Sequence, residues 1–311
     1  SITKKVTSVS FFGANTMHTA TVKKEILLSA GSIGSVQILE RSGIGQGDRL
    51  QKLGIKTVHH SLGVGENLQD HLQLRMIYKV KGISTLNTKA NSLFGKAMIG
   101  LEYLLNRSGP MSMAPSQLGA FTKSAGYHHR SNIQYHVQPL SLERFGEDLH
   151  KFNAITASVC NLRPSSRGFV HIDSPDLMAK PLIQPNYLST EEDQTVAVES
   201  IEITRKIMNQ DAFRRYQPEE YKPGAHLMSK KELVVAAGDI GTTIFHPVGT
   251  CKMGSRNDDS AVLDSELRVK GVQGLRVVDA SAMPTITSGN TAAPTMMMAY
   301  RVAELLRDNA S

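Results

Sequence analysis

Residues 25–43 read EILLSAGSIGSVQILERSG, and this stretch decides the fold. Glu25–Ser29 is a short apolar run typical of a buried strand, and Ala30-Gly31 follows it at once. Ile33–Arg41 then has the pattern of a helix, which Gly43 can end in the left-handed conformation. A strand, a glycine and a helix in this order let backbone approach a cofactor in an α/β sheet, so the stretch predicts an α/β domain.

Upstream of this stretch, two strand patterns flank a turn. Val6–Phe12 and Thr19–Val22 lie on either side of Gly13-Ala14-Asn15, so residues 1–31 are predicted to form a β-meander. The chain begins at Ser1 and reaches its first strand with no earlier element to pair it. We therefore expect a fragment or a processed product.

The middle of the chain predicts a second, α+β unit with an antiparallel sheet. A helix is expected near Leu93–Leu105, and two capping boxes, Ser189 with Glu192 and Ser229 with Glu232, predict the starts of two more helices. The strand-like runs are Met76–Val80, Ile133–Val137, Ile155–Val159 and Gly168–Ile172. From Thr242 the chain returns to the pattern of the first domain.

Composition narrows the class of protein. The 311 residues are 40% hydrophobic and 20% charged, the ordinary balance of a soluble globular protein. A formal charge of +7 with scattered basic residues argues against nucleic-acid binding, and no apolar run is long enough to cross a bilayer. Cys160 and Cys251 are too few for a disulfide framework, which favours a reducing compartment. We expect a cytoplasmic protein and leave a peripheral association with membranes open.

The candidate catalytic residues lie in the last quarter of the chain. The first of them is in the segment TTIFHPVGTCKMG, residues 242–254. Pro247 holds His246 in an extended conformation and so aims its side chain. A histidine near its ordinary pKa can take a proton from an alcohol at neutral pH, so His246 is a candidate base. The alternative is a structural histidine at a turn.

Two polar residues farther on are also candidates. Asp279 ends the strand Leu275–Val278, where its carboxylate can accept a hydrogen bond from a ligand, orient a backbone amide or cap the next turn. Asn290 can hold an alkoxide or hydroxyl beside His246, or simply cap the following helix. That helix begins near Pro294 and runs to Leu306, and the positive end of its dipole can stabilise an anionic ring.

Other motifs favour structure over chemistry. Met296–Met298 is expected to pack in the core, because methionine fills gaps in apolar interiors. The pairs His59-His60 and His128-His129 are not expected to bind metal, since neighbouring side chains diverge on strands and helices. No metal site is predicted.

Several motifs follow one another along the chain: Ala30–Ser35 with Ser42–Gly45, Gly63–His71, Arg163–Gly168, Pro185–Leu188, His246–Thr250 and Ser288–Thr291. Taken in this order, they resemble the glucose–methanol–choline family of flavin oxidoreductases. Val36 departs from the family's pattern, since proline or serine is usual there. The G-x-G-x-x-G turn with which the family begins is also absent.

The resemblance implies an FAD-dependent oxidation of a primary alcohol, choline-like or an alkanol, to an aldehyde by hydride transfer to the flavin N5. His246 would be the base on the substrate hydroxyl and Asn290 its hydrogen-bonding partner. By the same resemblance, the residues close to the cofactor would be Ala30, Gly31, Asp279, Ala280, Thr291 and Ala292.

The resemblance also implies domains. Residues 1–75 would be the C-terminal part of an FAD-binding domain, 76–235 a substrate-binding domain, and 236–311 the return to the first. The expected fold is α/β plus α+β, an incomplete FAD-binding Rossmann-like domain with an antiparallel-sheet substrate-binding domain. Because the G-x-G-x-x-G turn is absent, the chain alone is expected to hold FAD poorly and to turn over little. Its expected partners are the N-terminal flavin-binding half and a small-molecule alcohol.

Several alternatives stay open. The motifs also fit an alcohol oxidase, a lyase built on the same fold and a non-catalytic fragment. They do not identify the electron acceptor. A quaternary ammonium substrate calls for an aromatic or carboxylate cage, and the aromatic content is only 5%. The sequence therefore favours a neutral primary alcohol as the substrate.

Overall fold

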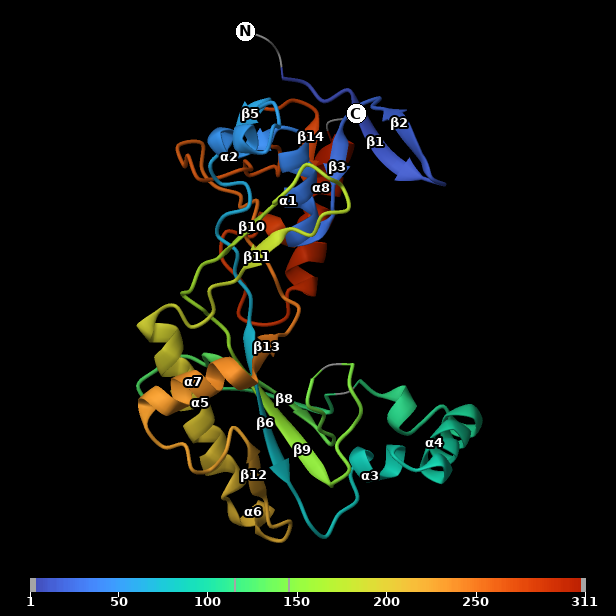
Figure 1. Cartoon of the computed structure of the whole chain (residues 1–311), viewed down its shortest axis with the longest axis vertical. Helices are drawn as coiled ribbons and strands as arrows, with labels where there is room; N and C mark the ends of the chain where they lie inside the picture. Colours follow the sequence, from blue (N-terminus) through green and yellow to red (C-terminus); the bar gives the residue numbers. More distant parts are fainter. Residues whose placement is uncertain (1–3, 115, 145, 309–311) are drawn as a thin grey trace. The chain divides into compact units, whose positions relative to one another are not determined.

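The computed structural model describes residues 4–114, 116–144 and 146–308, which fall into two compact units (Figure 1). Unit 1 consists of the chain up to Asp70, Ser166–Tyr187 and the chain from Phe245 onward. Unit 2 consists of His71–Ser165 and Leu188–Ile244. This division differs from the ranges 1–75, 76–235 and 236–311 mainly because residues 166–187 return to unit 1.

Unit 1 begins with a hairpin and a parallel strand pair. β1 (Ser8–Gly13) and β2 (Thr16–Thr21) are antiparallel across a two-residue turn whose φ values are both positive. β3 (Ile26–Leu28) does not extend this hairpin; it pairs in parallel with β14 (Leu275–Val277). The predicted meander is therefore wrong in its third strand. The partner of β3 lies about 250 residues away, where a local pattern cannot show it.

The predicted strand–glycine–helix unit is confirmed. α1 (Gly31–Arg41) follows β3, and Gly43 lies just beyond the helix with φ +79°. A Cβ at Gly43 would lie 2.4 Å from the carbonyl oxygen of Lys56, so the turn requires glycine there. The other elements of unit 1 are β4 (Ile44–Gly45), α2 (Gly47–Lys52), β5 (His59–His60), β10 (Phe169–His171), β11 (Leu182–Gln184), η2 (Ala280–Ala282) and α8 (Ala292–Asp308).

Unit 2 is built on an antiparallel sheet, as predicted. Its strand order is β12-β6-β9-β8-β7, and β13 also pairs with β6. The predicted strand Gly168–Ile172 is not part of this sheet: it forms β10 and pairs with β11 in unit 1. The strands are β6 (Leu72–Lys79), β7 (Leu118–Thr122), β8 (Ile133–Gln138), β9 (Ala154–Asn161), β12 (Glu219–Lys222) and β13 (Gly241–Thr243).

Helices cover one face of that sheet (Figure 1). α5 (Glu191–Met208) and α7 (Lys230–Ile240) pack on it. The capping box of Ser229 and Glu232 is confirmed. At α5, however, the N-cap is Thr190, which accepts a hydrogen bond from the backbone of Asp193, so the predicted start at Ser189 is wrong by one residue. The remaining helices are α3 (Leu86–Ala90), α4 (Leu93–Asn106), η1 (Pro110–Ser112) and α6 (Asp211–Arg214).

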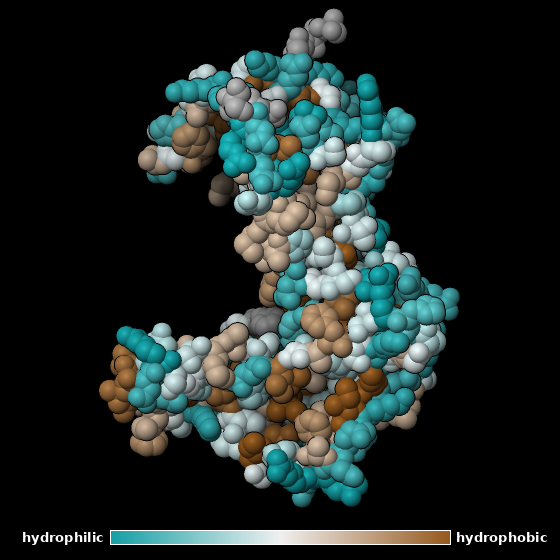
Figure 2. All heavy atoms as spheres, turned by 180° about the vertical axis from the view of Figure 1, so that it is seen from behind, coloured by the Kyte–Doolittle hydropathy of each residue, from teal (hydrophilic) through white to brown (hydrophobic). Residues whose placement is uncertain are grey.

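Two apolar segments face solvent. No residue of α4 is buried, and its hydrophobic side chains lie at the left edge of Figure 2. In α8, Met298 is buried, whereas Met296 and Met297 are 66% and 61% exposed. The prediction of a buried methionine run therefore holds for Met298 alone, because only that position turns towards the core of unit 1.

Candidate active site

The carboxyl ends of β3 and β14 meet the first turn of α1. Asp279 follows β14 directly, and its Oδ2 accepts hydrogen bonds from the backbone N–H of Gly31 at 2.9 Å and from the hydroxyl of Ser35 at 2.6 Å. Two of the predicted cofactor residues, 248 positions apart in the sequence, are thus joined directly. Ligands of α/β sheets bind at such carboxyl ends, so this is where a cofactor is expected.

The second carboxylate oxygen of Asp279 also accepts hydrogen bonds. Oδ1 accepts hydrogen bonds from the backbone N–H of Ser281 at 2.8 Å and from its hydroxyl at 2.5 Å, which makes Asp279 the N-cap of η2. Four protein donors occupy the carboxylate, about as many as its two oxygens accept. Asp279 therefore orients backbone at the ends of two elements, one of the roles that the sequence left open.

The loop that carries His246 is tied to the start of α1. Ser32 donates from its hydroxyl to the carbonyl oxygen of Pro247, and its own carbonyl accepts the hydroxyl of Thr250, both at 2.6 Å. Gly249 has φ +95°, and a Cβ there would lie 2.5 Å from the carbonyl oxygen of Asn67. These contacts hold the loop tightly against α1.

A neighbouring loop positions the histidine itself. Asp70 Oδ1 accepts the backbone N–H of His246 at 3.0 Å, and Asp70 Oδ2 accepts the hydroxyl of Tyr187 at 2.5 Å. Gln69 and Val248 exchange backbone hydrogen bonds at 3.0 and 2.8 Å. Neither Asp70 nor Tyr187 was predicted to have a role of its own. The sequence signal for Asp70 is a carboxylate near the end of the glycine-rich motif Gly63–His71.

His246 and Asn290 lie together, as expected. Asn290 Nδ2 is 3.4 Å from His246 Nε2, a geometry that fits an amide donor and an imidazole lone pair. The ring of His246 is almost fully buried, and this burial lowers its pKa while the charge of Asp70 partly opposes the shift. His246 is therefore neutral at neutral pH, the state that a base needs.

The backbone just before His246 is strained. Phe245 has φ +65°, the left-handed region that a bulky side chain rarely adopts. Such strain is found disproportionately at functional sites, where the surrounding structure holds it in place. It is consistent with a loop whose geometry serves the following histidine.

The other predicted residues lie in the same unit. Ala30 is the N-cap of α1, and the carbonyl of Ala280 accepts the backbone N–H of Gly249 at 3.4 Å. Thr291 is buried, and its carbonyl accepts the hydroxyl of Thr295 at 2.7 Å. Ala292 is the first residue of α8, so the positive end of that helix lies next to Asn290 in the chain.

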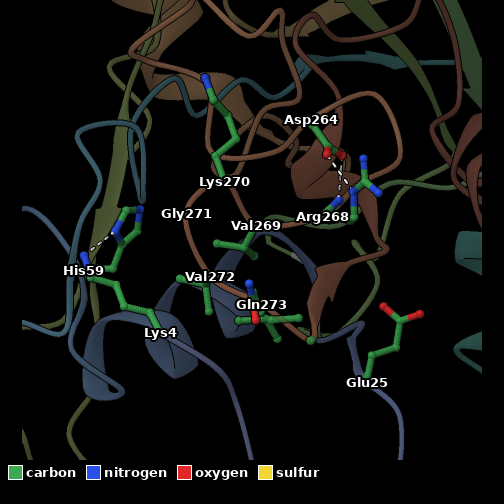
Figure 3. A pocket seen from close by; sticks show the side chains of 12 residues that line it. Lys4, Glu25, His59, Asp264, Arg268, Val269, Lys270, Gly271, Val272 and Gln273 are labelled. Atoms are coloured by element: carbon green, nitrogen blue, oxygen red, sulfur yellow. Dashed lines mark hydrogen bonds and ion pairs between the residues drawn. The ribbon is translucent and has the colours of Figure 1, made fainter. Parts of the chain in front are cut away.

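A cavity of about 670 Å³ lies at a different place in unit 1 (Figure 3). It is lined by Gly274 and Leu275, where β14 begins, and thus lies at the amino end of the parallel pair. Its cations already have partners: Arg268 bonds Asp264 at 2.8 Å, and Lys4 lies 3.1 Å from the ring of His59. It therefore lacks the features of a cofactor site in such a sheet.

The remaining candidates behave as structural residues. Within residues 4–114, 116–144 and 146–308, no three His, Cys, Asp or Glu side chains gather as a metal site would require. His128 instead bonds Glu199 at 3.1 Å. Cys160 and Cys251 are both buried and are not joined in a disulfide, and burial raises the pKa of Cys251, which makes its thiol unreactive.

Residues 2–73 and 164–299 match the GMC oxidoreductase family, and together these ranges cover more than half of the chain. The chain belongs to this family. It is 40% identical over 303 residues to an oxygen-dependent choline dehydrogenase of Vibrio vulnificus (strain YJ016), a match that covers 97% of this chain and 54% of the relative. A protein of the same name from Acinetobacter baumannii (strain AYE) is 41% identical, with 94% and 52% covered.

Solved structures agree with this assignment. Pyridoxine 4-oxidase from Mesorbium loti superposes with a TM-score of 0.83 at 26% identity, covering 98% of this chain and 55% of the other. A formate oxidase shares the fold with a TM-score of 0.90 at 24% identity, covering 98% and 58%. The family is one of FAD-dependent oxidoreductases that act on CH–OH groups, so the predicted enzyme class and cofactor are confirmed at the level of the family. The chain spans about half the length of the curated relatives it matches.

The residues present fit part of a flavin site. Gly31 has φ +76°, and no atom lies within 4 Å of the position of a Cβ, so the backbone at the start of α1 is open to a ligand. Helix starts such as those of α1 and α8 favour anionic groups. No helix in the described part of the chain combines the length and the apolar character needed to span a bilayer.

Proposed function

We propose that this chain carries the proton-transfer part of an FAD-dependent oxidation of a primary alcohol to an aldehyde. One observation carries the proposal: a buried histidine with a lowered pKa lies 3.4 Å from the amide of Asn290. The loop of His246 is bonded to the start of α1, where the parallel strands end. The choline dehydrogenases and oxidases that the chain resembles support this class of reaction.

The two side chains have distinct roles in this mechanism. His246 takes the proton of the substrate hydroxyl on a ring nitrogen, since it is neutral at neutral pH. Asn290 donates its Nδ2–H to the oxygen and stabilises the negative charge that develops there. FAD, when bound, would supply the redox chemistry as the hydride acceptor, and the backbone at Gly31 with the start of α8 would be the parts of this chain that hold it. Asp70 holds the backbone of His246 in place.

Residues 76–235 form the substrate-binding domain in this proposal, and 1–75 with 236–311 form part of the FAD-binding domain. Because the chain spans about half of its curated relatives, we propose that further residues complete the flavin site. The chain alone should then bind FAD weakly and turn over little. Mixing it with FAD and desalting tests this: we expect no retained flavin absorbance, whereas a retained yellow complex would contradict the proposal.

The reaction itself needs a reconstituted enzyme, in which this chain is joined to the residues of the Vibrio vulnificus relative that it does not match. A primary alcohol should bleach the flavin of this enzyme under anaerobic conditions. Absence of bleaching by any alcohol would contradict an alcohol oxidation and favour a flavin that is bound without redox use.

A further inference from the structure

α4 is a well-defined helix that unit 2 leaves uncovered. Ser92 caps its start by accepting the backbone N–H of Gly95 at 2.9 Å, and Arg107 ends it in the left-handed conformation. None of its 14 residues is buried. Helices of this length are marginal in water by themselves, because most of their stability comes from packing an apolar face. The exposure of α4 therefore indicates a partner outside the described part of unit 2.

One side of α4 holds it on its neighbours. α4 contacts α3 and η1. A Cβ at Gly95 would lie 1.8 Å from the carbonyl oxygen of Lys89 in α3, so the two helices approach closely there. Ile99 and Tyr103 are half-buried and follow Gly95 at intervals of four residues, which places them on the same side of the helix.

The opposite side of α4 is apolar and faces solvent. At 100° per residue, its large apolar side chains fall within an arc of about 140° that lies across the helix from Gly95, Ile99 and Tyr103. Leu93 is 87% exposed and Phe94 is 77% exposed, and these side chains lie at the left edge of Figure 2. The residues of this surface, which we call the apolar stripe, are Leu93, Phe94, Met98, Leu101, Leu104 and Leu105.

The chain around the apolar stripe is strongly basic. Residues 80–132, which connect β6 to β8, contain six Lys or Arg residues and a single acidic residue, Glu102. This segment thus carries +5 of the formal net charge of +7. All six cations are exposed, and none forms a salt bridge within the residues that the structure describes. They are Lys81, Lys89, Lys96, Arg107, Lys123 and Arg130.

Charge and length together select the partner. Lysine is depleted in protein–protein interfaces, whereas an apolar helix face with cations beside it is typical of helices that lie on anionic membranes. A helix of 14 residues is about 21 Å long, too short to cross a hydrocarbon core of about 30 Å. The fitting arrangement is a helix that lies along the membrane surface.

We propose that α4 docks on the surface of an anionic phospholipid membrane. Its apolar stripe enters the boundary between headgroups and acyl chains, and the basic side chains around it contact the lipid phosphates. This inference goes beyond the proposed function, because it assigns a surface and a partner that the oxidation does not use.

Co-sedimentation with lipid vesicles tests the docking. Vesicles of phosphatidylcholine with about 30% phosphatidylglycerol should bind the 311-residue chain at least about 10-fold more tightly than pure phosphatidylcholine. High salt should weaken this binding, because it screens exposed charges. The reconstituted enzyme should behave in the same way. Equal affinity for the two kinds of vesicle, or no binding to either, would overturn the proposal.

The apolar contribution is tested by replacing Phe94 and Leu105 together with glutamine, which keeps the charge and favours a helix. The double variant should bind the anionic vesicles at least about 10-fold more weakly. Its unfolding temperature should stay the same, since both side chains face solvent. Met178→Gln, which replaces an apolar residue 87% exposed in unit 1, is the matched control and should bind as the wild type does. A double variant with wild-type affinity would contradict the assignment of α4.

The electrostatic contribution is tested at Lys96. Lys96→Gln should weaken binding to the anionic vesicles by about 5-fold, because one cation near the surface is lost. Lys180→Gln removes an exposed cation of unit 1 instead and should have no effect. Equal losses in the two variants would show that only the net charge of the chain matters, and would count against a defined docking surface.

A fluorescent probe locates the contact. The chain contains no tryptophan, so Leu101→Trp places a single indole in the apolar stripe. Its emission should move to shorter wavelength when anionic vesicles are added, because the indole leaves water. Met178→Trp should show no such shift. An unshifted Leu101→Trp chain that still sediments with the vesicles would show that another surface binds them.

Two further outcomes would identify a different partner for α4. If the 311-residue chain binds the vesicles but the reconstituted enzyme does not, the rest of the enzyme covers the apolar stripe. If sedimentation velocity without lipid shows a dimer that the double glutamine variant loses, and the vesicles bind neither form, the partner is a second copy of the chain. Either result would overturn the proposal and leave the alcohol oxidation intact.

Discussion

Asp70 Oδ1 accepts the backbone N–H of His246 at 3.0 Å, across 176 positions of sequence. The same carboxylate accepts the hydroxyl of Tyr187 through its other oxygen at 2.5 Å. A buried carboxylate thus fixes the backbone of the candidate base from a separate loop, while its charge opposes the loss of basic strength that burial causes. Residues that orient a reacting group in this way act on its geometry and its pKa together.

Replacing Asp70 should therefore slow flavin reduction in the reconstituted enzyme. We expect Asp70→Ala to lower the rate by about 10- to 100-fold, because His246 loses its anchor. Asp70→Asn keeps an oxygen that can accept the backbone N–H and should lose less. Tyr187→Phe is the matched control for the second bond alone. Stopped-flow absorbance measures all three, and a wild-type rate in Asp70→Ala would refute the anchoring role.

The pH dependence of flavin reduction should follow His246. Burial lowers its pKa below the ordinary 6.5, so the neutral ring, which can accept a proton, already predominates at pH 6.5. The rate should be level above that pH and fall only as the pH drops through the lowered pKa. Asp70→Asn removes the charge that raises this pKa, so the fall should move to lower pH. A rate that keeps rising well above pH 6.5 contradicts the assignment.

Gly249 should not tolerate a side chain. Its φ of +95° and the carbonyl of Asn67, 2.5 Å from a Cβ position, make Gly249→Ala costly by about 1–3 kcal/mol or more. Gly100 in α4 is the matched control, since no atom lies near its Cβ position and alanine favours a helix by roughly 0.5–1 kcal/mol. Thermal unfolding of the two variants should shift in opposite directions. A Gly249→Ala chain as stable as the wild type would show that the turn can relax.

An internal ion cluster makes the stability of unit 1 depend on pH. His171 lies between two carboxylates, with Nδ1 2.7 Å from Glu40 and Nε2 3.0 Å from Glu66. Burial lowers the pKa of His171, but the hydrogen bonds with both glutamates outweigh it and leave the pKa above 6.5. The hydrogen bond with His171 is the main cause that lowers the pKa of Glu66 below 4.5, against its burial.

The direction of each pKa shift determines the pH range in which the cluster stabilises unit 1. The contribution of His171 is complete below about pH 6.5 and is lost as the pH rises through its raised pKa. That of Glu66 is complete above about pH 4.5 and is lost as the pH falls through its lowered pKa. Unfolding temperature should thus peak between these values. Glu66→Gln should lower it there by roughly 2–4 °C, about 1 kcal/mol, whereas the exposed Glu191→Gln should not. An unchanged pH profile in Glu66→Gln would count against the cluster.

Sequence patterns predicted the structure correctly where it depends on interactions between residues close together in the chain. The capping box at Ser229, the left-handed Gly43 and the antiparallel runs of unit 2 all depend on residues a few positions apart. The start of α5 was wrong by one position because both Ser189 and Thr190 can cap, and only the structure shows that Thr190 does. Neighbouring cap candidates cannot be ranked from sequence.

The features that could not be predicted from the sequence depend on residues far apart in the chain. Nothing near Ile26–Leu28 indicates that it pairs with Leu275–Val277, and this pairing is what brings Asp279 to Gly31. Asp70 was missed for a similar reason, since its partner His246 lies in another part of the chain. The pairing of His246 with Asn290 was predicted from the order of several motifs along the chain. Neither residue predicts it alone, because a histidine at a turn and an asparagine at a helix cap are both ordinary.

The most direct measurement of the central claim is anaerobic flavin reduction by a primary alcohol in the reconstituted enzyme, compared with its His246→Ala variant. If His246 takes the hydroxyl proton, the rate should fall by about 10²- to 10⁴-fold while FAD stays bound. His129→Ala, which replaces an exposed histidine in unit 2, should reduce at the wild-type rate. A His246→Ala enzyme that reduces its flavin as fast as the wild type would show that the base lies elsewhere.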